Sequence, residues 1–193
     1  AGAGNDSIDG GSEADKLWGN GGDDYIDGGL GADTVFAGSG NDVVNDLDGD
    51  NWVQANTGND SVSTGEGSDY IEGNNGADSI LSAGGNDLIY GDALVDQNIV
   101  YSEFDETQDQ SGWNDYIDAG TGDDVVYGSL GHDTLLGGEG NDWISGDSGR
   151  DSIVGGIGND SLYGGHLEDT LEGGEGDDLL SGHTGNDLLS GGN

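Results

Sequence analysis

The chain of 193 residues contains no cysteine, no proline and almost no basic side chain. Without cysteine, neither a disulfide scaffold nor a thiolate metal site can form. Without proline, and without glycine at every third position, a collagen triple helix is excluded. Lys16 and Arg150 are the only lysine and arginine, so we expect neither nucleic acid nor anionic lipid as a partner. No apolar run reaches about 18 residues, so we expect no membrane span.

Acidic residues and glycine dominate what is present. There are 41 Asp and Glu residues and 43 glycines, and the formal net charge is -39. A chain this acidic with few apolar residues is typical of intrinsic disorder. The alternative is that bound cations cancel the charge, and the internal repeat described next favours this second interpretation.

A nine-residue unit repeats along the chain, and residues 155–163 (GGIGNDSLY) are a clear copy. We number each unit so that its aspartate is position 6. Self-similarity at a short fixed period indicates a solenoid. Asn51 stands where one aspartate is expected; the position-6 aspartates themselves are Asp6, Asp15, Asp24, Asp33, Asp42, Asp60, Asp69, Asp78, Asp87, Asp115, Asp124, Asp133, Asp142, Asp151, Asp160, Asp169, Asp178 and Asp187.

The repeat divides the chain into two arrays. Asp87 and Asp115 are 28 positions apart, one more than three units, so the register is interrupted between them. We therefore predict a first array over residues 1–93, an insertion over residues 94–112 and a second array over residues 113–193. Long loops are often functional, but an insertion merely tolerated at a corner of a coil explains this segment equally well.

An aliphatic residue stands at position 8 of every unit, two residues after the aspartate. One inward apolar residue between two outward ones is the pattern of a very short strand, and the surrounding glycine, Asn and Asp residues favour turns. Each unit is therefore predicted to be a three-residue strand followed by a six-residue turn. The inward residues are Ile8, Leu17, Ile26, Val35, Val44, Val53, Val62, Ile71, Ile80, Ile89, Ile117, Val126, Leu135, Ile144, Ile153, Leu162, Leu171, Leu180 and Leu189.

The units resemble the nonapeptide of the RTX (repeats-in-toxin) family, Gly-Gly-x-Gly-x-Asp-x-aliphatic-x. The resemblance covers everything except residues 94–112. It implies an all-β fold, a right-handed parallel β-roll with two units per coil. It also implies that calcium ions lie between turns on the same side of the roll, two units apart in sequence.

Calcium suits these turns because it prefers six to eight hard oxygen ligands, from carboxylates and carbonyls. Glycine-rich turns can point carbonyls inward without side-chain clashes. At most about fifteen ions are expected, which would reduce the net charge to roughly -9, an ordinary surface balance. The predicted ligands are the eighteen aspartates together with the carbonyls of Gly28, Gly31, Gly73, Gly76, Gly128, Gly131, Gly137, Gly140, Gly146, Gly149, Gly155, Gly158, Gly164, Gly173, Gly176, Gly182 and Gly185.

The turns are not equally good copies of the repeat. Residues 46–51 (DLDGDN) lack both the glycine pair and the position-6 aspartate. They suggest an EF-hand loop, but the bidentate Glu at the twelfth position is missing and no room remains for helices. Other departures are the position-4 residues Glu13, Trp113 and Leu167 and the pairs at 55–56 and 82–83. We expect the first array to bind calcium more weakly, with some turns empty.

Outward aromatic residues fall on alternate units of the first array: Trp18, Phe36, Trp52, Tyr70 and Tyr90. They are predicted to line one of its two sheets. Cross-strand packing that stiffens the sheet is one interpretation. A docking face for a neighbouring domain, a sister chain or a sugar polymer is the other.

The chain lacks the marks of an enzyme, because neither a Ser-His-Asp set nor a zinc motif stands out from the repeat. We interpret it as a calcium-binding structural module of a secreted bacterial protein. The resemblance implies type I secretion of an unfolded chain that folds outside the cell. One alternative is a self-assembling surface-layer or fibre subunit, whose stacked chains share calcium end to end. The other is a polysaccharide-binding module beside a catalytic domain.

Overall fold

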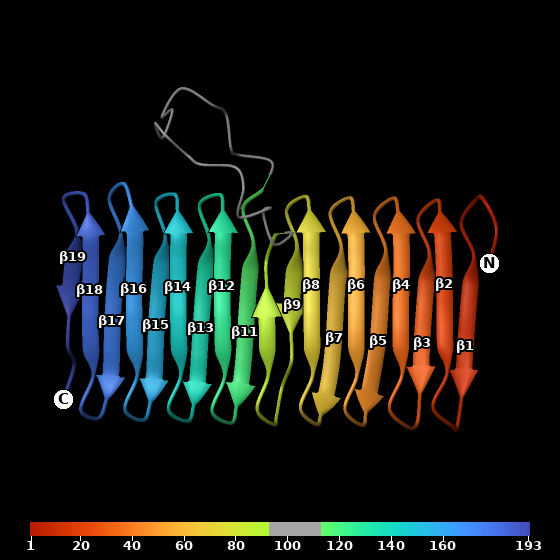
Figure 1. Ribbon diagram of the computed structural model, residues 1–193, viewed down its shortest axis with the longest axis horizontal. Coiled ribbons are helices and arrows are strands. Elements are labelled where there is room, and N and C mark those ends of the chain that lie inside the picture. The colour runs from red at the N-terminus through yellow and green to blue at the C-terminus, as the bar shows by residue number, and fades with distance from the viewer. Residues whose placement is uncertain (93–112) are drawn as a thin grey trace, which may run out of the picture.

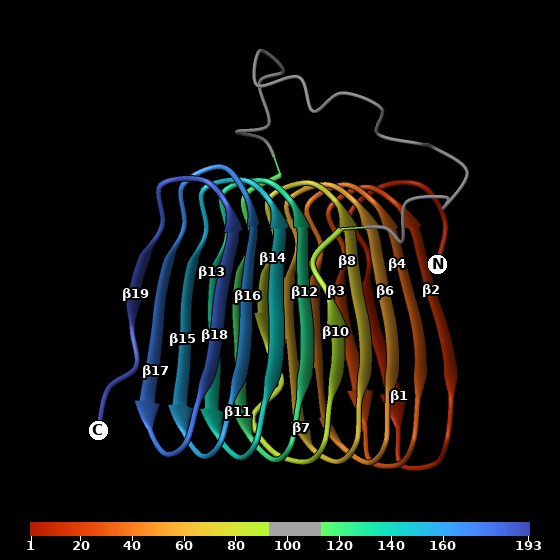
Figure 2. The ribbon, with the colours of Figure 1, turned by 60° about the vertical axis from the view of Figure 1, so that its left-hand side comes forward.

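The computed structural model describes residues 1–92 and 113–193, and in them the chain winds into a parallel β-solenoid. Each coil places one strand in each of two facing sheets, and the two ends of the chain lie at opposite ends of the stack (Figures 1 and 2). The described residues contain no helix, and accordingly none long and apolar enough to cross a membrane. The predicted β-roll with two units per coil is confirmed, but the prediction of three-residue strands is wrong for most units, because strand pairing extends into the glycine-rich residues, as in β4 (Thr34–Ser39).

Odd-numbered strands form one sheet and even-numbered strands form the other. The ten-stranded sheet contains β1 (Ser7–Gly11), β3 (Tyr25–Gly29), β5 (Val43–Asp48), β7 (Ser61–Glu66), β9 (Ser79–Leu81), β11 (Tyr116–Thr121), β13 (Thr134–Glu139), β15 (Ser152–Ile157), β17 (Thr170–Glu175) and β19 (Leu188–Ser190). The nine-stranded sheet contains β2 (Lys16–Gly21), β4 (Thr34–Ser39), β6 (Trp52–Thr57), β8 (Tyr70–Asn75), β10 (Leu88–Tyr90), β12 (Val125–Leu130), β14 (Trp143–Ser148), β16 (Ser161–His166) and β18 (Leu179–Thr184).

Strand pairing follows the repeat. Neighbouring strands pair 18 residues apart, as Ser7 does with Tyr25. Between β9 and β11 the offset becomes 37 residues, as in the pair Ser79 and Tyr116, yet the pairing stays parallel. Both sheets therefore continue from the first array into the second. The predicted insertion lies outside the described residues.

The core is one cluster of aliphatic side chains that both sheets contribute to the space between them. Sixteen of the nineteen position-8 residues are buried. Ile8 and Leu180 are only partly buried, and Leu189 is 44 % exposed, because the end coils are covered on one side only. The inward orientation predicted for position 8 is thus confirmed, with exposure at the ends. Ala37, Ala55 and Ala119 at position 1 add to the core, since this position also points inward.

In most turns, successive coils approach so closely at position 4 that a glycine is favoured there. Gly158 has φ of 147°, and a Cβ on it would lie 1.6 Å from the carbonyl oxygen of Gly140. Position 2 also takes positive φ, but there Asn20, Asn56 and Asn74 do so as well as glycine. Asparagine tolerates the left-handed region better than most residues, so this position accepts it.

Candidate calcium sites

The position-6 aspartates form two columns, one along each edge of the roll. Beyond the first coil, the Oδ1 atom of each accepts a hydrogen bond from the backbone N–H of the position-6 residue one coil earlier; Asp160 accepts from Asp142 at 2.9 Å and Asp178 from Asp160 at 3.0 Å. Asp151 in turn accepts from Asp133 in the other column, at 2.9 Å. Across the offset of 37 residues, Asp124 accepts from Asp87 at 2.7 Å. Aspartates two units apart in sequence therefore lie in the same column.

The second carboxylate oxygen of these residues has no partner. Of the eighteen position-6 aspartates, all within the described residues, fifteen have an Oδ2 atom that is buried and makes no hydrogen bond. The other three, Asp6, Asp15 and Asp187, lie in end coils. Buried polar atoms are nearly always hydrogen-bonded in proteins, so a regular series of unpartnered oxygens calls for a ligand.

A carbonyl oxygen of the next coil lies beside each of these oxygens in the regular turns. A Cβ placed on Gly155 would lie 2.3 Å from Oδ2 of Asp160 and 2.6 Å from the carbonyl oxygen of Gly173. The glycine at position 1 thus leaves a space beside two acceptors, a carboxylate oxygen and a carbonyl oxygen, with no donor between them. Among the predicted carbonyl ligands, those seen in this place are Gly28, Gly128, Gly146, Gly155, Gly164 and Gly173.

Other predicted carbonyls lie at position 4. Those of Gly31, Gly131, Gly140 and Gly158 approach the position-4 glycine of the following coil. The described residues contain no cluster of three or more His, Asp or Glu side chains suited to a metal. Calcium at these turns would therefore be bound by paired carboxylates together with carbonyls, a mixture of hard oxygens that this ion prefers. The full ligand set stays a prediction.

The electrostatics of the columns also favour a cation. Burial, together with the neighbouring Asp169 carboxylate, raises the pKa of Asp151 to about 7, although a backbone hydrogen bond from Asp133 opposes the shift. Burial likewise raises the pKa of Asp124 to about 7 and of Asp142 to about 6. In the described part of the chain the one ion pair joins Arg150 and Glu168, on the surface. The protein therefore supplies no positive charge to the columns.

A second hydrogen-bonded ladder, which the sequence reasoning missed, runs along position 5. The Oδ1 of Asn141 accepts the backbone N–H of Asn159 at 3.0 Å, and that of Asn159 accepts the N–H of Asp177 at 2.9 Å. Here the acceptor lies one coil earlier than the donor, the reverse of position 6. His132 takes the same place by accepting from Arg150 through Nδ1. The recurrence of Asn and Asp at position 5 was the available signal.

The described ends of the turn interrupted by the insertion keep the regular geometry. A Cβ on Gly91 would lie 2.1 Å from Oδ2 of Asp115 and 2.7 Å from the carbonyl oxygen of Gly128. Gly91 is thus position 1 of the turn that Asp115 ends. Asp92 follows at position 2, where its buried Oδ1 has no partner and burial raises its pKa to about 8. Asp92 is a candidate ligand that the spacing of the aspartates did not reveal.

Two of the irregular turns show how the coil accommodates a departure. Leu167 takes φ of 78° at position 4, and its carbonyl oxygen approaches Gly185 as a glycine carbonyl would. Its turn keeps its shape, with a bulky residue in a left-handed conformation. In the turn over residues 46–51, Asp46 is fully buried and burial raises its pKa to about 8.

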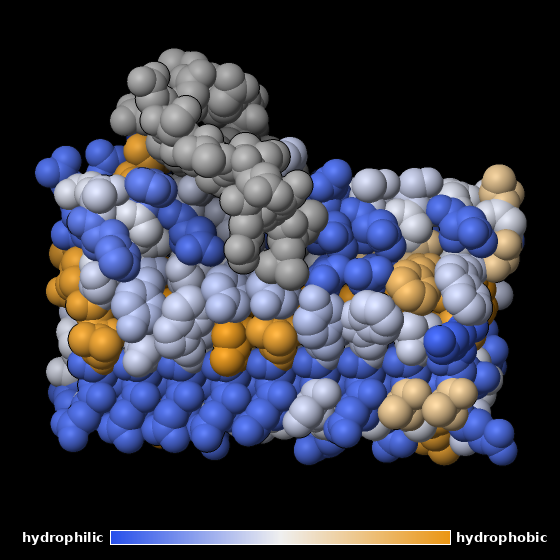
Figure 3. All heavy atoms as spheres, in the orientation of Figure 1, coloured by the Kyte–Doolittle hydropathy of each residue, from blue (hydrophilic) through white to orange (hydrophobic). Residues whose placement is uncertain are grey.

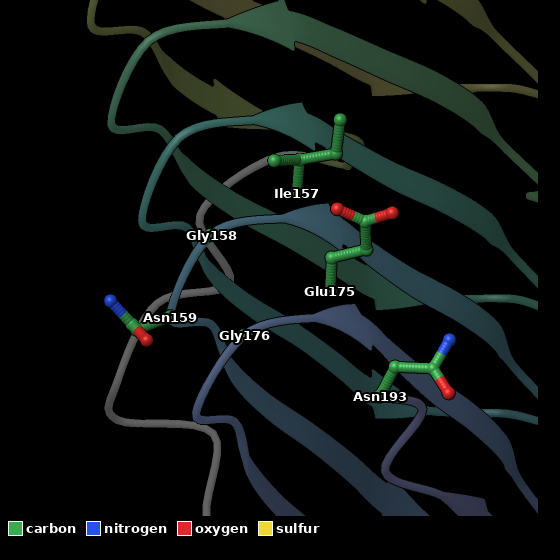
Figure 4. Close-up of a pocket in the computed structure, with 6 residues that line it drawn as sticks. All are labelled: Ile157, Gly158, Asn159, Glu175, Gly176 and Asn193. Atoms are coloured by element: carbon green, nitrogen blue, oxygen red, sulfur yellow. The ribbon is translucent and has the colours of Figure 1, made fainter.

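A groove of about 450 Å³ lies outside the columns, beside the last turns of the edge that carries Asp160 and Asp178. Figure 4 shows Ile157, Glu175 and Asn193 from successive coils pointing to one side, while Asn159 projects from the other. No position-6 carboxylate lines this groove. It is therefore a surface feature and not the calcium site.

Aromatic rings form a continuous ladder on the outer face of the nine-stranded sheet. Figure 3 shows this face, with large side chains along it above a strongly hydrophilic band of turn residues. The five predicted residues are neighbours in the ladder, with ring centroids 5.6–6.0 Å apart. The ladder extends beyond them into the second array through Tyr127, Trp143, Tyr163 and His183. Cross-strand packing is thus present, and docking stays untested.

Parallel coils whose turns bring carboxylates and carbonyls together without counter-charge define a calcium-binding β-solenoid. The model of the RTX calcium-binding nonapeptide repeat matches residues 1–35, 36–71, 63–97, 114–135, 136–165 and 167–193. These matches cover most of the chain, which therefore belongs to this family. Its repeats form structural calcium-binding modules that are not typically catalytic. A search of curated proteins returned no match.

Proposed function

We propose that this chain is a calcium-responsive β-roll module of a secreted bacterial protein, and that calcium drives its folding outside the cell. The observation that carries the proposal is the series of fifteen buried, unpartnered Oδ2 atoms at position 6. A dication between successive coils gives each of them a partner and turns a repulsive stack of carboxylates into an attractive one.

The thin core supports folding coupled to metal binding. Each unit buries one aliphatic side chain, in a chain with a net charge of -39. Because so little apolar surface is buried per residue, metal binding has to contribute much of the folding free energy. Extracellular calcium modules bind with a Kd of about 10⁻⁴–10⁻³ M, so they stay empty at cytosolic calcium. An unfolded chain inside the cell suits type I secretion, and we assign the module no catalytic role.

Far-UV circular dichroism during a calcium titration tests the proposal. In excess chelator at about pH 8, above the raised pKa values of the buried aspartates, the strand signal should be lost, and calcium in the millimolar range should restore it. Magnesium is the matched control, because it demands octahedral geometry at shorter distances and dehydrates reluctantly. A full strand signal in chelator, or equal recovery with magnesium, would contradict the proposal.

The C-terminal coil favours a second role, stacking on another coil. Leu189, at position 8 in β19, is 44 % exposed, whereas the position-8 residues of inner coils are buried. A neighbouring domain of a longer protein or a sister chain placed end to end would cover it and pair the strand edge. Light scattering of this chain during the calcium titration separates the two. Growth into long particles that Leu189→Ser prevents supports sister-chain stacking, and folding without growth contradicts it.

A further inference from the structure

Asn51 stands at the one gap in the aspartate columns, and its side chain has no free oxygen. Its Oδ1 accepts the backbone N–H of Asp33 at 2.9 Å, as a position-6 aspartate would. Its Nδ2 donates to the carbonyl oxygen of Asp46 at 3.0 Å. The Asn51 side chain therefore has an amide nitrogen in place of the unpartnered Oδ2 atom of a position-6 aspartate. The side chain of Asn51 can support the coil but offers a cation no oxygen.

Asp46 carries the carboxylate that Asn51 lacks. It stands at position 1 of the same turn, a position that other units fill with Gly, Ala, Ser or Thr. Its side chain points into the roll, with 0 % of the residue exposed. Neither Oδ1 nor Oδ2 makes a hydrogen bond. A fully buried carboxylate with both oxygens unpartnered is costly unless it has a ligand.

The position of this carboxylate matches that of a regular site. A Cβ on Gly28, one coil earlier, would lie 2.3 Å from Cγ and Oδ1 of Asp46. In a regular turn the atom found in this direction is Oδ2 of position 6, as for Gly155 and Asp160 at 2.3 Å. Asp33, at position 6 of the turn that Gly28 begins, also has an unpartnered Oδ2. Three carboxylate oxygens without donors thus belong to this pair of turns.

We propose that Asp46, together with Asp33, holds a calcium ion between the turns over residues 28–33 and 46–51. The acidic ligand has moved from position 6 to position 1 of the same turn, and Asn51 has become its hydrogen-bonding support. The departure from the repeat is then an exchange of ligands and not the loss of a site. This inference rests on the calcium-binding role proposed above.

Anomalous diffraction from crystals of the full chain grown with calcium tests the assignment directly. We expect a calcium peak contacting Asp46 and Asp33, and its loss in Asp46→Asn. Asp50→Asn is the matched control, because it removes one charge from the same turn at an exposed site. Asp50 accepts the N–H of Ser68, and asparagine accepts in the same way at other position-5 sites. The peak should persist in this control.

A double variant, Asp46→Gly with Asn51→Asp, separates ligand exchange from a general need for Asp46. It rebuilds the regular pattern, so it should fold and regain an ion contacting position 6, even where Asp46→Asn alone fails to fold.

Equilibrium dialysis should show about one calcium ion fewer for Asp46→Asn only. Calcium peaks at Asp142 and Asp160 without a peak at Asp46 would overturn this inference alone. The Asp46 and Asp33 carboxylates would then share a proton in place of the ion. Absence of every peak would overturn the calcium-binding role itself.

Discussion

The ring of Tyr90 stacks on the ring of Tyr127, with centroids 4.9 Å apart and planes 6° apart. The two residues are 37 positions apart in sequence and belong to adjacent strands, β10 and β12. The aromatic ladder therefore passes the insertion without a break and spans both predicted arrays. Stacked and edge-on pairs of this kind stabilise a sheet beyond the area they bury, and they also leave a face of rings exposed to solvent.

Replacing Trp18 and Trp52 with serine tests whether this face binds a partner. They are 48 % and 41 % exposed, and Trp18 and Phe36 line a groove of about 360 Å³ beside Asn20 and Asn56. Because both rings lie outside the roll, calcium-dependent folding should survive. If the face docks a neutral polysaccharide, that binding, measured by affinity electrophoresis, should be abolished in the variant, since flat rings stack on sugars. A polyanionic sugar would be repelled by the net charge.

The matched control for that face is Tyr25→Ser. Tyr25 is 45 % exposed on the other sheet, which carries few aromatic residues. It should leave both folding and sugar binding unchanged. The ladder would be structural packing only if the double variant of Trp18 and Trp52 matched the parent chain in its affinity for the sugar, for a sister chain and for a neighbouring domain.

Acid should favour the metal-free fold. Burial raises the pKa of Asp60, Asp124 and Asp151 to about 7, from 3.8. Because the folded pKa lies above the unfolded one, folding takes up protons. The resulting stabilisation is complete below about pH 4 and is lost as the pH rises through about 7. In excess chelator, circular dichroism should therefore show strand signal growing from pH 8 toward pH 4.

With calcium present the dependence should reverse. Protons and calcium compete for the same carboxylates, so the calcium concentration at the folding midpoint should rise as the pH falls below about 7. A metal-free chain whose strand signal is equally weak at pH 4.5 and pH 8 would mean that these carboxylates do not control the unfolding free energy.

Leu167→Gly should stabilise the roll. Leu167 is held at φ of 78°, in a position where sixteen other units have a glycine of positive φ. The left-handed region costs a residue with Cβ about 1–2 kcal/mol, and the greater freedom of glycine in the unfolded chain offsets part of this. We expect a gain of about 0.5–1 kcal/mol in the unfolding free energy, measured by denaturant titration in saturating calcium.

Leu167→Ala controls for the loss of the leucine side chain. It removes the same contacts but keeps a Cβ in the left-handed region, so it should give no gain. Equal effects of glycine and alanine would show that side-chain contacts, and not backbone conformation, decide stability at this turn.

Gly158→Ala should be strongly destabilising, by more than about 3 kcal/mol. Its Cβ would lie 1.6 Å from the carbonyl oxygen of Gly140, so two coils would have to separate. Gly4→Ala is the control, because Gly4 has φ of 113° at the same position of its unit with nothing within 4 Å. It should cost only the conformational term, about 1–2 kcal/mol. Equal losses in thermal melts with calcium would refute the importance of the close approach.

Much of the fold could be predicted because a strict period leaves few alternatives. Each nine-residue unit contains one inward aliphatic residue and one glycine-rich turn. Ile26, Ile144 and their equivalents therefore had to lie in one core, and the aspartates had to form columns. Coils that repeat in sequence repeat in space, and the register follows from counting. The same counting placed the five aromatic residues on one sheet.

What the tertiary structure alone decided concerns atoms that the period does not distinguish. Counting could not show that Oδ1 of Asp160 accepts a backbone N–H while Oδ2 stays buried without a partner. It could not show that Gly91 lies beside Oδ2 of Asp115 across the insertion, or that the Asp46 carboxylate lies beside Gly28. These relationships depend on contacts between coils 18 or 37 residues apart, and such contacts exist only once the chain is wound.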